Sequence, residues 1–303
     1  MVQVHNFAYG ILNPGLAYLV SCLGCFLGLQ CTNRARAMEG ASRARWLLLA
    51  AVSIGVTGIW VMHFIAMLGF TIDEQIIQYN VPVTILSMLV AVIVVAVGLL
   101  IVGFGAEGPR PLLLGGTIIG IGVAGMHYMG MWAMRMPDTM HWNVPLVILS
   151  VIIAIVAGTA ALWAALRLHG GTAVILGASL IMGVAVSGMH YTGMAALHVF
   201  SAPNGGMLAM GSGAGATSFL LPLILGISIL TFLVTAVVTL APTAEEIRED
   251  AALMERIDRL SNELGQAPAP LARGSKSVTA GNRSAVGRGG GVWDSRDRPD
   301  PQR

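Results

Sequence analysis

The sequence GMHYMGM at residues 125–131 recurs as GMHYTGM at residues 188–194 and, more distantly, as IWVMHFIAM at residues 59–67. Each copy has the form Met-His-aromatic-x-(Gly/Ala)-Met, and the three histidines are 64 and 63 residues apart. Repetition at a fixed period indicates a chain built from repeated structural units. The pattern therefore predicts three copies of one unit, each with a histidine at an equivalent position.

The motifs lie within a set of seven long apolar stretches. A helix needs about 20 predominantly apolar residues to cross a bilayer, and a chain in lipid must hydrogen-bond its own backbone, which favours helices. Each motif period contains two such stretches. The predicted fold class is therefore an all-α membrane protein with seven transmembrane helices, built as three two-helix repeats plus one. The expected spans are residues 12–32, 46–70, 82–104, 112–134, 144–167, 173–198 and 219–241.

The composition excludes several classes of protein. The 303 residues are 55% hydrophobic and 11% charged, with a mean hydropathy of +0.77, whereas soluble domains contain roughly 25% charged residues. This deficit argues against a soluble enzyme, a disordered chain and a nucleic-acid partner. The sequence shows no paired carboxylates, nucleophile–base set or phosphate-binding loop, so we expect that the chain is not an enzyme.

Basic residues predict the orientation in the membrane. Sixteen of the 17 Lys and Arg lie in the first, third and fifth connections or after the last span, and Arg135 alone lies in an opposite connection. Cytoplasmic segments carry this excess of positive charge. The N-terminus is therefore expected outside and the C-terminus in the cytoplasm. The first span is not expected to be a cleaved signal peptide, because its basic residues follow the apolar run.

Three segments are expected along the chain. Residues 9–241 form the membrane domain, and residues 265–303, rich in Gly, Pro, Ser and Arg, are expected to be disordered. Residues 243–264 have the pattern of an amphipathic cytoplasmic helix, which either pairs two protomers or lies beside the membrane. Its apolar residues repeat at intervals of 4, 3 and 4, and they are Leu253, Ile257, Leu260 and Leu264.

The three motif histidines are expected at one depth. By the expected spans, each lies seven or eight residues before the outer end of its helix, which is roughly 10–12 Å below the outer face. A methionine four residues later shares the helix face of each histidine, and the methionine just before it points roughly 100° away. The candidate metal ligands are His63, His127, His190, Met62, Met67, Met126, Met131, Met189 and Met194.

Imidazole and thioether groups without a carboxylate favour a soft metal. This donor set suits copper, above all Cu(I), rather than Mg²⁺ or Ca²⁺, and zinc would more often recruit Cys or a carboxylate. Haem between two of the histidines is an alternative, and so is metal-free packing with hydrogen bonds between helices. Tyr128 and Tyr191 either support the ligands or belong to the interfacial aromatic belt.

The three motifs together resemble the MHYT family of bacterial integral membrane sensor domains, named after the sequence found at residues 189–192. The resemblance covers roughly residues 9–241. It implies a seven-span module in the bacterial cytoplasmic membrane that binds copper through Met, His and Tyr near the outer face and senses oxygen, CO or NO. Phe64 and Met129 depart from the Tyr and Thr of the name motif.

The resemblance also raises the question of output. Many members carry cyclic di-GMP enzymes or other output domains, and none is expected in this sequence. Signalling would then pass through residues 243–264, an unidentified cytoplasmic partner or a homodimer. The leading hypothesis is a copper-dependent membrane sensor of a diatomic gas. The alternative is copper transport or metal handling at the outer face, which the one-sided position of the histidines disfavours.

Overall fold

The structure of the chain is a computed structural model that describes residues 4–5, 7–72, 77–105, 108–136, 139–167, 171–200, 213–240 and 244–265. It has two compact units, Met1–Asp250 and Ala251–Arg303, which are considered separately. Among the described residues, seven helices are long and apolar enough to cross a membrane. They confirm the prediction of an all-α multi-pass membrane protein. The spans are Leu12–Arg36, Gly40–Leu68, Val81–Phe104, Pro109–Trp132, Val144–Arg167, Thr172–Ala195 and Ser218–Leu240.

The second and seventh spans each combine two kinds of helix. The second runs without a break through α2, η1 and α3, and the seventh through η2 and α8, where η denotes a π-helix. The helices of the first unit are α1 (Leu12–Arg36), α2 (Gly40–Val52), η1 (Ser53–Val61), α3 (Met62–Leu68), α4 (Val81–Phe104), α5 (Pro109–Trp132), α6 (Val144–Arg167), α7 (Thr172–Ala195), η2 (Ala216–Leu220) and α8 (Leu221–Leu240).

Two helices begin at the same local sequence, Asn-Val-Pro. The Asn80 side chain accepts a hydrogen bond from the Val83 amide at 3.1 Å, and Pro82 occupies the first turn of α4. At the start of α6, Asn143 accepts from the Leu146 amide at 3.3 Å. An Asn cap satisfies a free amide of the first turn, where proline loses no hydrogen bond. The same device thus starts the first helix of the second and third repeats.

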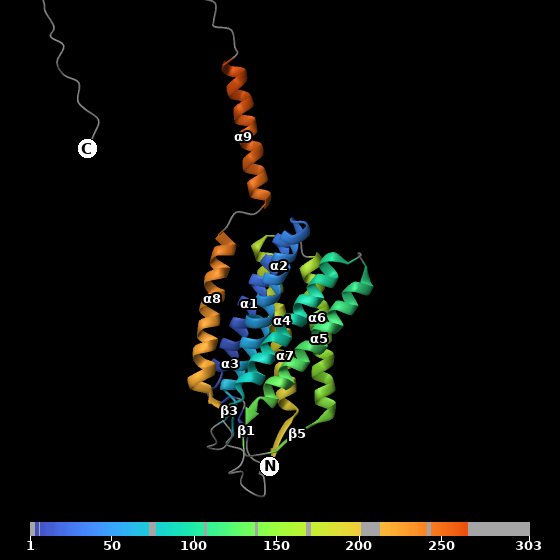
Figure 1. Cartoon of the computed structure of the whole chain (residues 1–303), viewed down its shortest axis with the longest axis vertical. Helices are drawn as coiled ribbons and strands as arrows, with labels where there is room; N and C mark the ends of the chain where they lie inside the picture. Colours follow the sequence, from blue (N-terminus) through green and yellow to red (C-terminus); the bar gives the residue numbers. More distant parts are fainter. Residues whose placement is uncertain are drawn as a thin grey trace, which may run out of the picture. The chain divides into compact units, whose positions relative to one another are not determined.

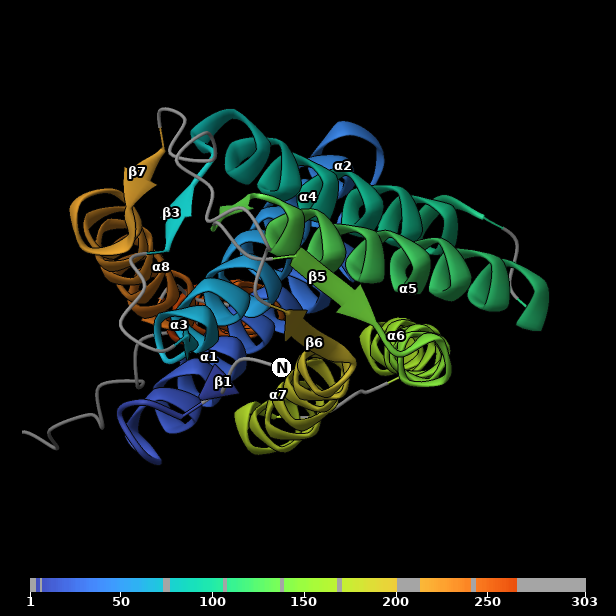
Figure 2. The ribbon, with the colours of Figure 1, turned by 90° about the horizontal axis from the view of Figure 1, so that it is seen from below.

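The repeats are arranged around a common centre (Figures 1 and 2). The second helix of each repeat, represented by α3, α5 and α7, carries a motif to this centre. The first helices lie between them: α1 packs against η1 and α7, α4 against η1 and α5, and α6 against α5 and α7. Helix α8 lies outside this ring against α1 and η1. The sequence repeat therefore becomes an approximate threefold arrangement in space.

Small residues bring α1 and η1 into close contact. A Cβ atom at Gly24 would lie 2.3 Å from the amide nitrogen of Gly58 and 2.9 Å from the carbonyl oxygen of Ser53. Two hydroxyls bridge the helices: Ser53 donates to the Gly24 carbonyl at 2.8 Å, and Ser21 donates to the Gly58 carbonyl at 2.7 Å. Close backbone approach with hydroxyl bridges is a common way to pack membrane helices.

The π-helix η1 directly precedes the first motif. Nine residues are long for a π-helix, which usually occurs as a single turn and often at functional sites. Neighbouring helices hold it in place: Thr57 shares a 2.6 Å hydrogen bond with Thr231 of α8, and the Trp60 indole donates to Ser87 of α4 at 3.0 Å. The segment that leads to His63 is thus fixed by α1, α4 and α8.

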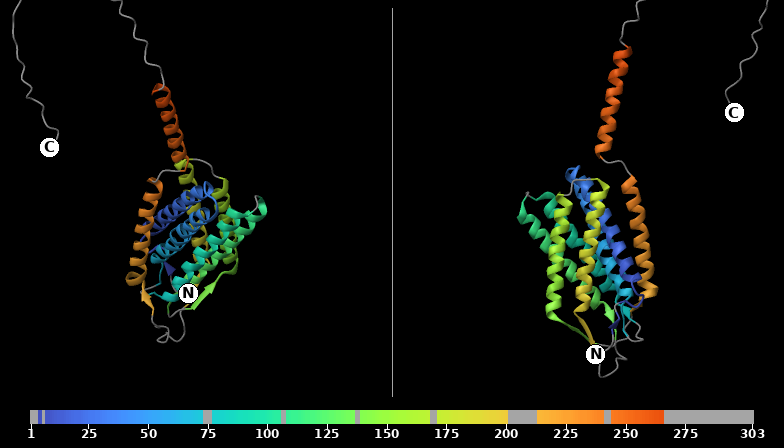
Figure 3. Two further views of the ribbon diagram at one scale, coloured as in Figure 1. Left: turned by 45° about the horizontal axis from the view of Figure 1, so that its top comes forward. Right: turned by 180° about the vertical axis from the view of Figure 1, so that it is seen from behind.

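Short strands cover the ends of the motif helices, a feature that the sequence did not predict (Figures 1 and 3). They are too short to show a clear alternation of polar and apolar residues. In the described residues, one sheet pairs β1 (Val4–His5) with β2 (Thr71–Ile72), and another pairs β5 (Thr139–Trp142) with β6 (Leu197–Phe200). A third sheet has three strands in the order β4-β3-β7, which are β4 (Met134–Arg135), β3 (Gln78–Tyr79) and β7 (Ala214–Gly215). Every strand follows or precedes a span at the motif-bearing end.

Helix α9 (Ala244–Gly265) corresponds to the expected amphipathic segment 243–264. Its apolar residues Leu253, Ile257 and Leu260 are exposed, and Arg259 pairs with Glu255 one turn earlier. Thr243, the side chain of Leu264 and residues 266–303 lie outside the described residues. The roles assigned to residues 243–264 and 265–303 therefore stay predictions.

Substitution of Gly24 by alanine tests the close α1–η1 contact. The added methyl group would collide with backbone atoms, so we expect Gly24→Ala to destabilise the folded protein by about 1–3 kcal/mol, the usual cost of overpacking. Thermal unfolding in detergent measures the effect. Gly226→Ala in α8 is the control, since a Cβ there meets no described atom within 4 Å. Equal unfolding temperatures for the two variants would show that the α1–η1 contact does not require a glycine at position 24.

Candidate metal centre

The three motif histidines lie at one level of the bundle. His63 in α3, His127 in α5 and His190 in α7 each lie five residues before the end of their helices. At 1.5 Å per residue this is about 7–8 Å, less than the predicted 10–12 Å. The difference arises because the apolar runs continue beyond the helices into the turns and strands that follow. The expected common level is confirmed.

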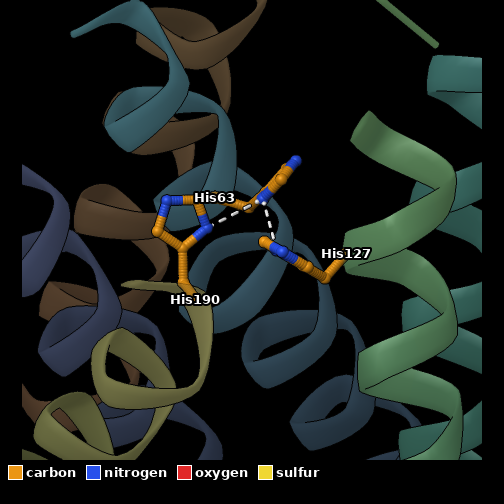
Figure 4. A group of neighbouring side chains, drawn as sticks. All are labelled: His63, His127 and His190. Carbon is orange, nitrogen blue, oxygen red and sulfur yellow. Dashed lines mark hydrogen bonds between the residues drawn. The ribbon is translucent and has the colours of Figure 1, made fainter. Parts of the chain in front are cut away.

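The imidazole rings converge from three different helices (Figure 4). The Nδ1 atom of His63 lies 3.0 Å from Nδ1 of His190 and 3.2 Å from Nδ1 of His127. The ring centroids are 5.0, 5.0 and 5.1 Å apart, and the planes meet at 76–88°. Each residue is only 1% exposed. The rings thus form a buried three-bladed cluster with one nitrogen of each histidine at its centre.

The motif glycines make room for the neighbouring rings. A Cβ atom at Gly130 would lie 2.5 Å from Nε2 of His63, and one at Gly193 would lie 2.5 Å from Nε2 of His127. The outer nitrogen of each of these histidines therefore faces the small residue of the next motif. At Gly125 and Gly188, by contrast, a Cβ would meet no described atom within 4 Å. Of the two glycines in the second and third motifs, only the second is required by the cluster.

Ordinary hydrogen bonds cannot satisfy this cluster. A neutral imidazole nitrogen either donates a proton or accepts with one lone pair, yet Nδ1 of His63 contacts two other Nδ1 atoms. The Nε2 atoms of His63 and His127 are also buried without a hydrogen-bond partner among the described residues. Such unsatisfied buried groups are uncommon in native structures and call for an explanation. The cluster therefore lacks a complete set of partners within the protein.

Two of the three distances between the Nδ1 atoms are close to those expected around a single metal ion. Three nitrogens at 2.0–2.1 Å from one ion, in trigonal or tetrahedral geometry, would be about 3.3–3.6 Å apart. The observed contacts of 3.0 and 3.2 Å are close to that spacing. In the part of the chain that the structure describes, these residues form the one group of three or more His, Cys, Asp or Glu close enough to hold an ion. The donor set is compatible with a metal and does not identify it.

The six candidate methionines are buried in the same layer. Each is at most 4% exposed, and they are Met62, Met67, Met126, Met131, Met189 and Met194. Each motif contributes two of these methionines, one immediately before its histidine and one a helical turn after it. Their burial agrees both with packing and with a supporting thioether shell, and their role as ligands stays a prediction.

The two motif tyrosines have different surroundings. The Tyr128 hydroxyl shares a 2.6 Å hydrogen bond with Ser150 of α6, and its ring lies 4.9 Å from that of His127. The Tyr191 ring lies 4.9 Å from the His190 ring and 5.6 Å from Phe7. Both rings therefore pack against the cluster, while the Tyr128 hydroxyl fixes α5 to α6. A supporting role stays a prediction for both.

Tyr79 is a neighbour that sequence reasoning missed. It lies in β3, is 1% exposed, and its ring is 5.8 Å from that of Phe64, which in turn lies 4.7 Å from the His63 ring. Burial raises the pKa of the Tyr79 hydroxyl above its usual value, so this group stays neutral. No motif marks Tyr79 in the sequence. Its position depends on the strand pairing that covers the cluster.

Comparison with known proteins gives a consistent family match. Residues 57–116 and 120–178 each match the family model MHYT, described as a bacterial signalling protein N terminal repeat. These matches include His63 and His127, whereas His190 lies beyond them. The structure places all three histidines in equivalent positions, which supports a third copy. No solved structure matches the chain.

Relatives with similar sequences are signalling proteins. The bifunctional diguanylate cyclase/cyclic di-GMP phosphodiesterase MucR of Pseudomonas aeruginosa is 39% identical over 194 residues, 62% of this chain and 28% of MucR. The cyclic di-GMP phosphodiesterase NbdA of the same species is 36% identical over 275 residues, 88% of this chain and 34% of NbdA. The signaling protein YkoW of Bacillus subtilis is 29% identical over 198 residues, 63% of this chain and 24% of YkoW.

The chain spans about a third or less of the length of these relatives. Its described residues contain no catalytic domain. The enzymatic activities named for MucR and NbdA are therefore properties of those longer proteins.

Substitution of Gly130 by alanine tests whether the second glycine of a motif makes room for the histidine of the preceding motif. The methyl group would displace the His63 ring, so we expect Gly130→Ala to reduce the metal that the purified protein retains. Gly188→Ala, which adds a methyl group in open space, is the matched control and should retain the wild-type amount. Metal analysis by mass spectrometry distinguishes the variants, and equal retention would refute this role for the glycine.

Proposed function

This chain belongs to the MHYT family of bacterial signalling proteins, and we propose that it is a membrane sensor whose histidine cluster binds copper and responds to a diatomic gas such as oxygen, CO or NO. The observation that carries the proposal is the convergence of three buried Nδ1 atoms from three repeats. The family match and the signalling relatives support a sensory role.

The donor chemistry favours copper. The cluster offers three imidazoles within a layer of buried thioethers, and no carboxylate of the described residues joins it. Imidazole and thioether suit copper, particularly Cu(I), whereas hard cations require oxygen ligands. Bound copper would supply an open coordination position for a small neutral ligand. The residues around it would hold the ion and exclude water through the covering strands.

The threefold arrangement links the cluster to the whole bundle. Each ligand comes from a different repeat, so a change in the distance between two histidines moves α3, α5 or α7 relative to the others. A ligand shifts such an equilibrium only if it binds two helix arrangements with different affinity. Close contacts such as that of Gly130 with His63 leave little space for independent ring motion. The proposed signal is therefore a small displacement of the motif helices.

The proposed setting is the bacterial cytoplasmic membrane, with the N-terminus and the histidine cluster toward the outer face. The excess of Lys and Arg at the opposite end supports this orientation. Output would pass to the cytoplasmic side, through residues 243–264, a homodimer or a separate signalling partner. The activities named for MucR and NbdA make a cyclic di-GMP enzyme the favoured partner.

The two alternative functions fit the geometry less well. Haem between two histidines needs space for a porphyrin, and the 3.0 Å contact between His63 and His190 leaves none. Copper transport would be expected to use further ligands along a path, and the described residues contain no second group of three or more His, Cys, Asp or Glu close enough to hold an ion. A sensor therefore remains the proposed function.

Removal of all three imidazoles tests the copper site. We expect wild-type protein from copper-supplemented cells to retain copper and the His63→Ala/His127→Ala/His190→Ala variant to lose it, because no equivalent nitrogen donors remain. The control is His141→Ala/His198→Ala, which removes two histidines from β5 and β6. Equal copper content in all three proteins would refute the site, and a Soret band in the wild type would identify haem instead.

The proposed orientation is tested by cysteine labelling. The three native cysteines are buried, so an impermeant maleimide should label introduced cysteines with little background. We expect Thr139→Cys, exposed at the motif-bearing end, to react in intact cells and Arg45→Cys, exposed at the opposite end, to react only after lysis. The reverse pattern would place the cluster at the cytoplasmic face.

A further inference from the structure

A large apolar cavity lies within the membrane-spanning part of the bundle. Its volume is about 430 Å³, and it is lined by aliphatic, glycine and methionine residues together with one tryptophan. Most of its wall comes from α6 and α7, where alanine and glycine leave space between the helices. Trp163, Val174 and Ile181 of this lining are 51%, 43% and 71% exposed. The cavity therefore opens sideways, toward lipid.

The other end of the cavity lies close in sequence to the motif histidines, although none of the three lines it. Its lining includes Ile59, Val123 and Val186, which each precede a motif histidine by four residues. Residues four apart lie one above the other on an α-helix, so Val123 and Val186 lie about one turn below His127 and His190, and Ile59 lies in η1 just before α3. Met189, adjacent to His190 in the sequence, also lines the cavity. The cavity and the cluster are thus stacked along the axis of the bundle.

The opposite side of the cluster is closed. The histidines are 1% exposed, and the strands that follow the motif helices cover their outer end. An uncharged gas dissolves in the lipid interior and encounters an almost wholly apolar lining along the cavity. Enclosed apolar cavities in proteins stay dry and bind small apolar molecules, including xenon, and the lining of this cavity is similarly apolar. The lipid side therefore offers the more direct route to the imidazoles.

We propose that this cavity is a binding site for small apolar molecules and that a diatomic gas passes through it from the lipid to the underside of the histidine cluster. The gas-binding role rests on the proposed function, whereas the binding of apolar molecules does not. A charged or polar ligand would find a lining in which Trp163 is the one side chain with a hydrogen-bonding group, the indole N–H. The proposal commits to a diatomic gas, because the lining includes Ile59, Val123 and Val186, four residues before the three motif histidines. A lipid acyl chain retained in the cavity is an outcome of the test.

Xenon tests the site independently of copper. In metal-free full-length protein in nanodiscs, with methionine methyl groups labelled for NMR, xenon pressure should shift the Met182 and Met189 signals saturably, because both residues line the cavity. The Met131 signal, outside the lining, should not respond. Ala178→Phe and the milder Ala178→Leu place bulk in the cavity and should weaken or abolish the response. Val184→Phe, on the lipid-exposed surface of the same helix, is the control.

Nitric oxide tests the route in the copper-loaded protein. Ala178→Phe should retain the wild-type copper content and slow the change in the copper spectrum after mixing with nitric oxide, while Val184→Phe should match the wild type. Absence of a xenon response, or an acyl chain retained in the cavity, would overturn the binding site. If xenon binds in the wild type but Ala178→Phe does not slow the reaction of the copper-loaded protein with nitric oxide, the proposed route would be overturned. A wild type without copper would refute the proposed function, and the xenon result would still decide the binding site.

Discussion

The contact among three imidazoles is the constraint on which the rest of the structure depends. Side chains from three repeats can meet at separations near 3 Å only if their helices approach closely and end at one level. The second glycine of the second and third motifs provides the space, because the outer nitrogen of the preceding histidine lies only 2.5 Å from the position that a Cβ atom would take. Each of these two motifs thus contains a histidine that could bind a metal and a glycine that makes room for the histidine of the preceding motif. This explains why the histidine and the glycine recur together.

The surroundings of the cluster separate water from lipid. On one side, short strands and buried aromatic residues such as Tyr79 and Phe64 cover the rings. On the other side, an apolar cavity extends from the layer beneath the rings to the lipid-facing surface of α6 and α7. Hydrogen bonds from Ser21, Thr57 and Trp60 hold the span that carries His63. This arrangement suits a buried centre that exchanges small neutral ligands with the membrane.

Much of the fold could be predicted because membrane helices have strong requirements. Length and apolar composition located all seven spans, and the motif period predicted the common level of the histidines. The strands could not be predicted, because segments as short as Gln78–Tyr79 form only through pairing with distant residues. The close α1–η1 contact at Gly24 and Gly58 and the cavity beside the alanines of α6 and α7 depend on how the helices pack. Sequence spacing alone does not reveal such packing.

The nature of the centre finally depends on what the three Nδ1 atoms bind. X-ray absorption at the copper edge measures this most directly in wild-type protein purified with copper. We expect a shell of imidazole nitrogens at about 2.0 Å, the usual distance of a metal–histidine bond, and loss of that shell when His63, His127 and His190 are replaced. A first shell without imidazole, or one unchanged by the replacement, would contradict the account.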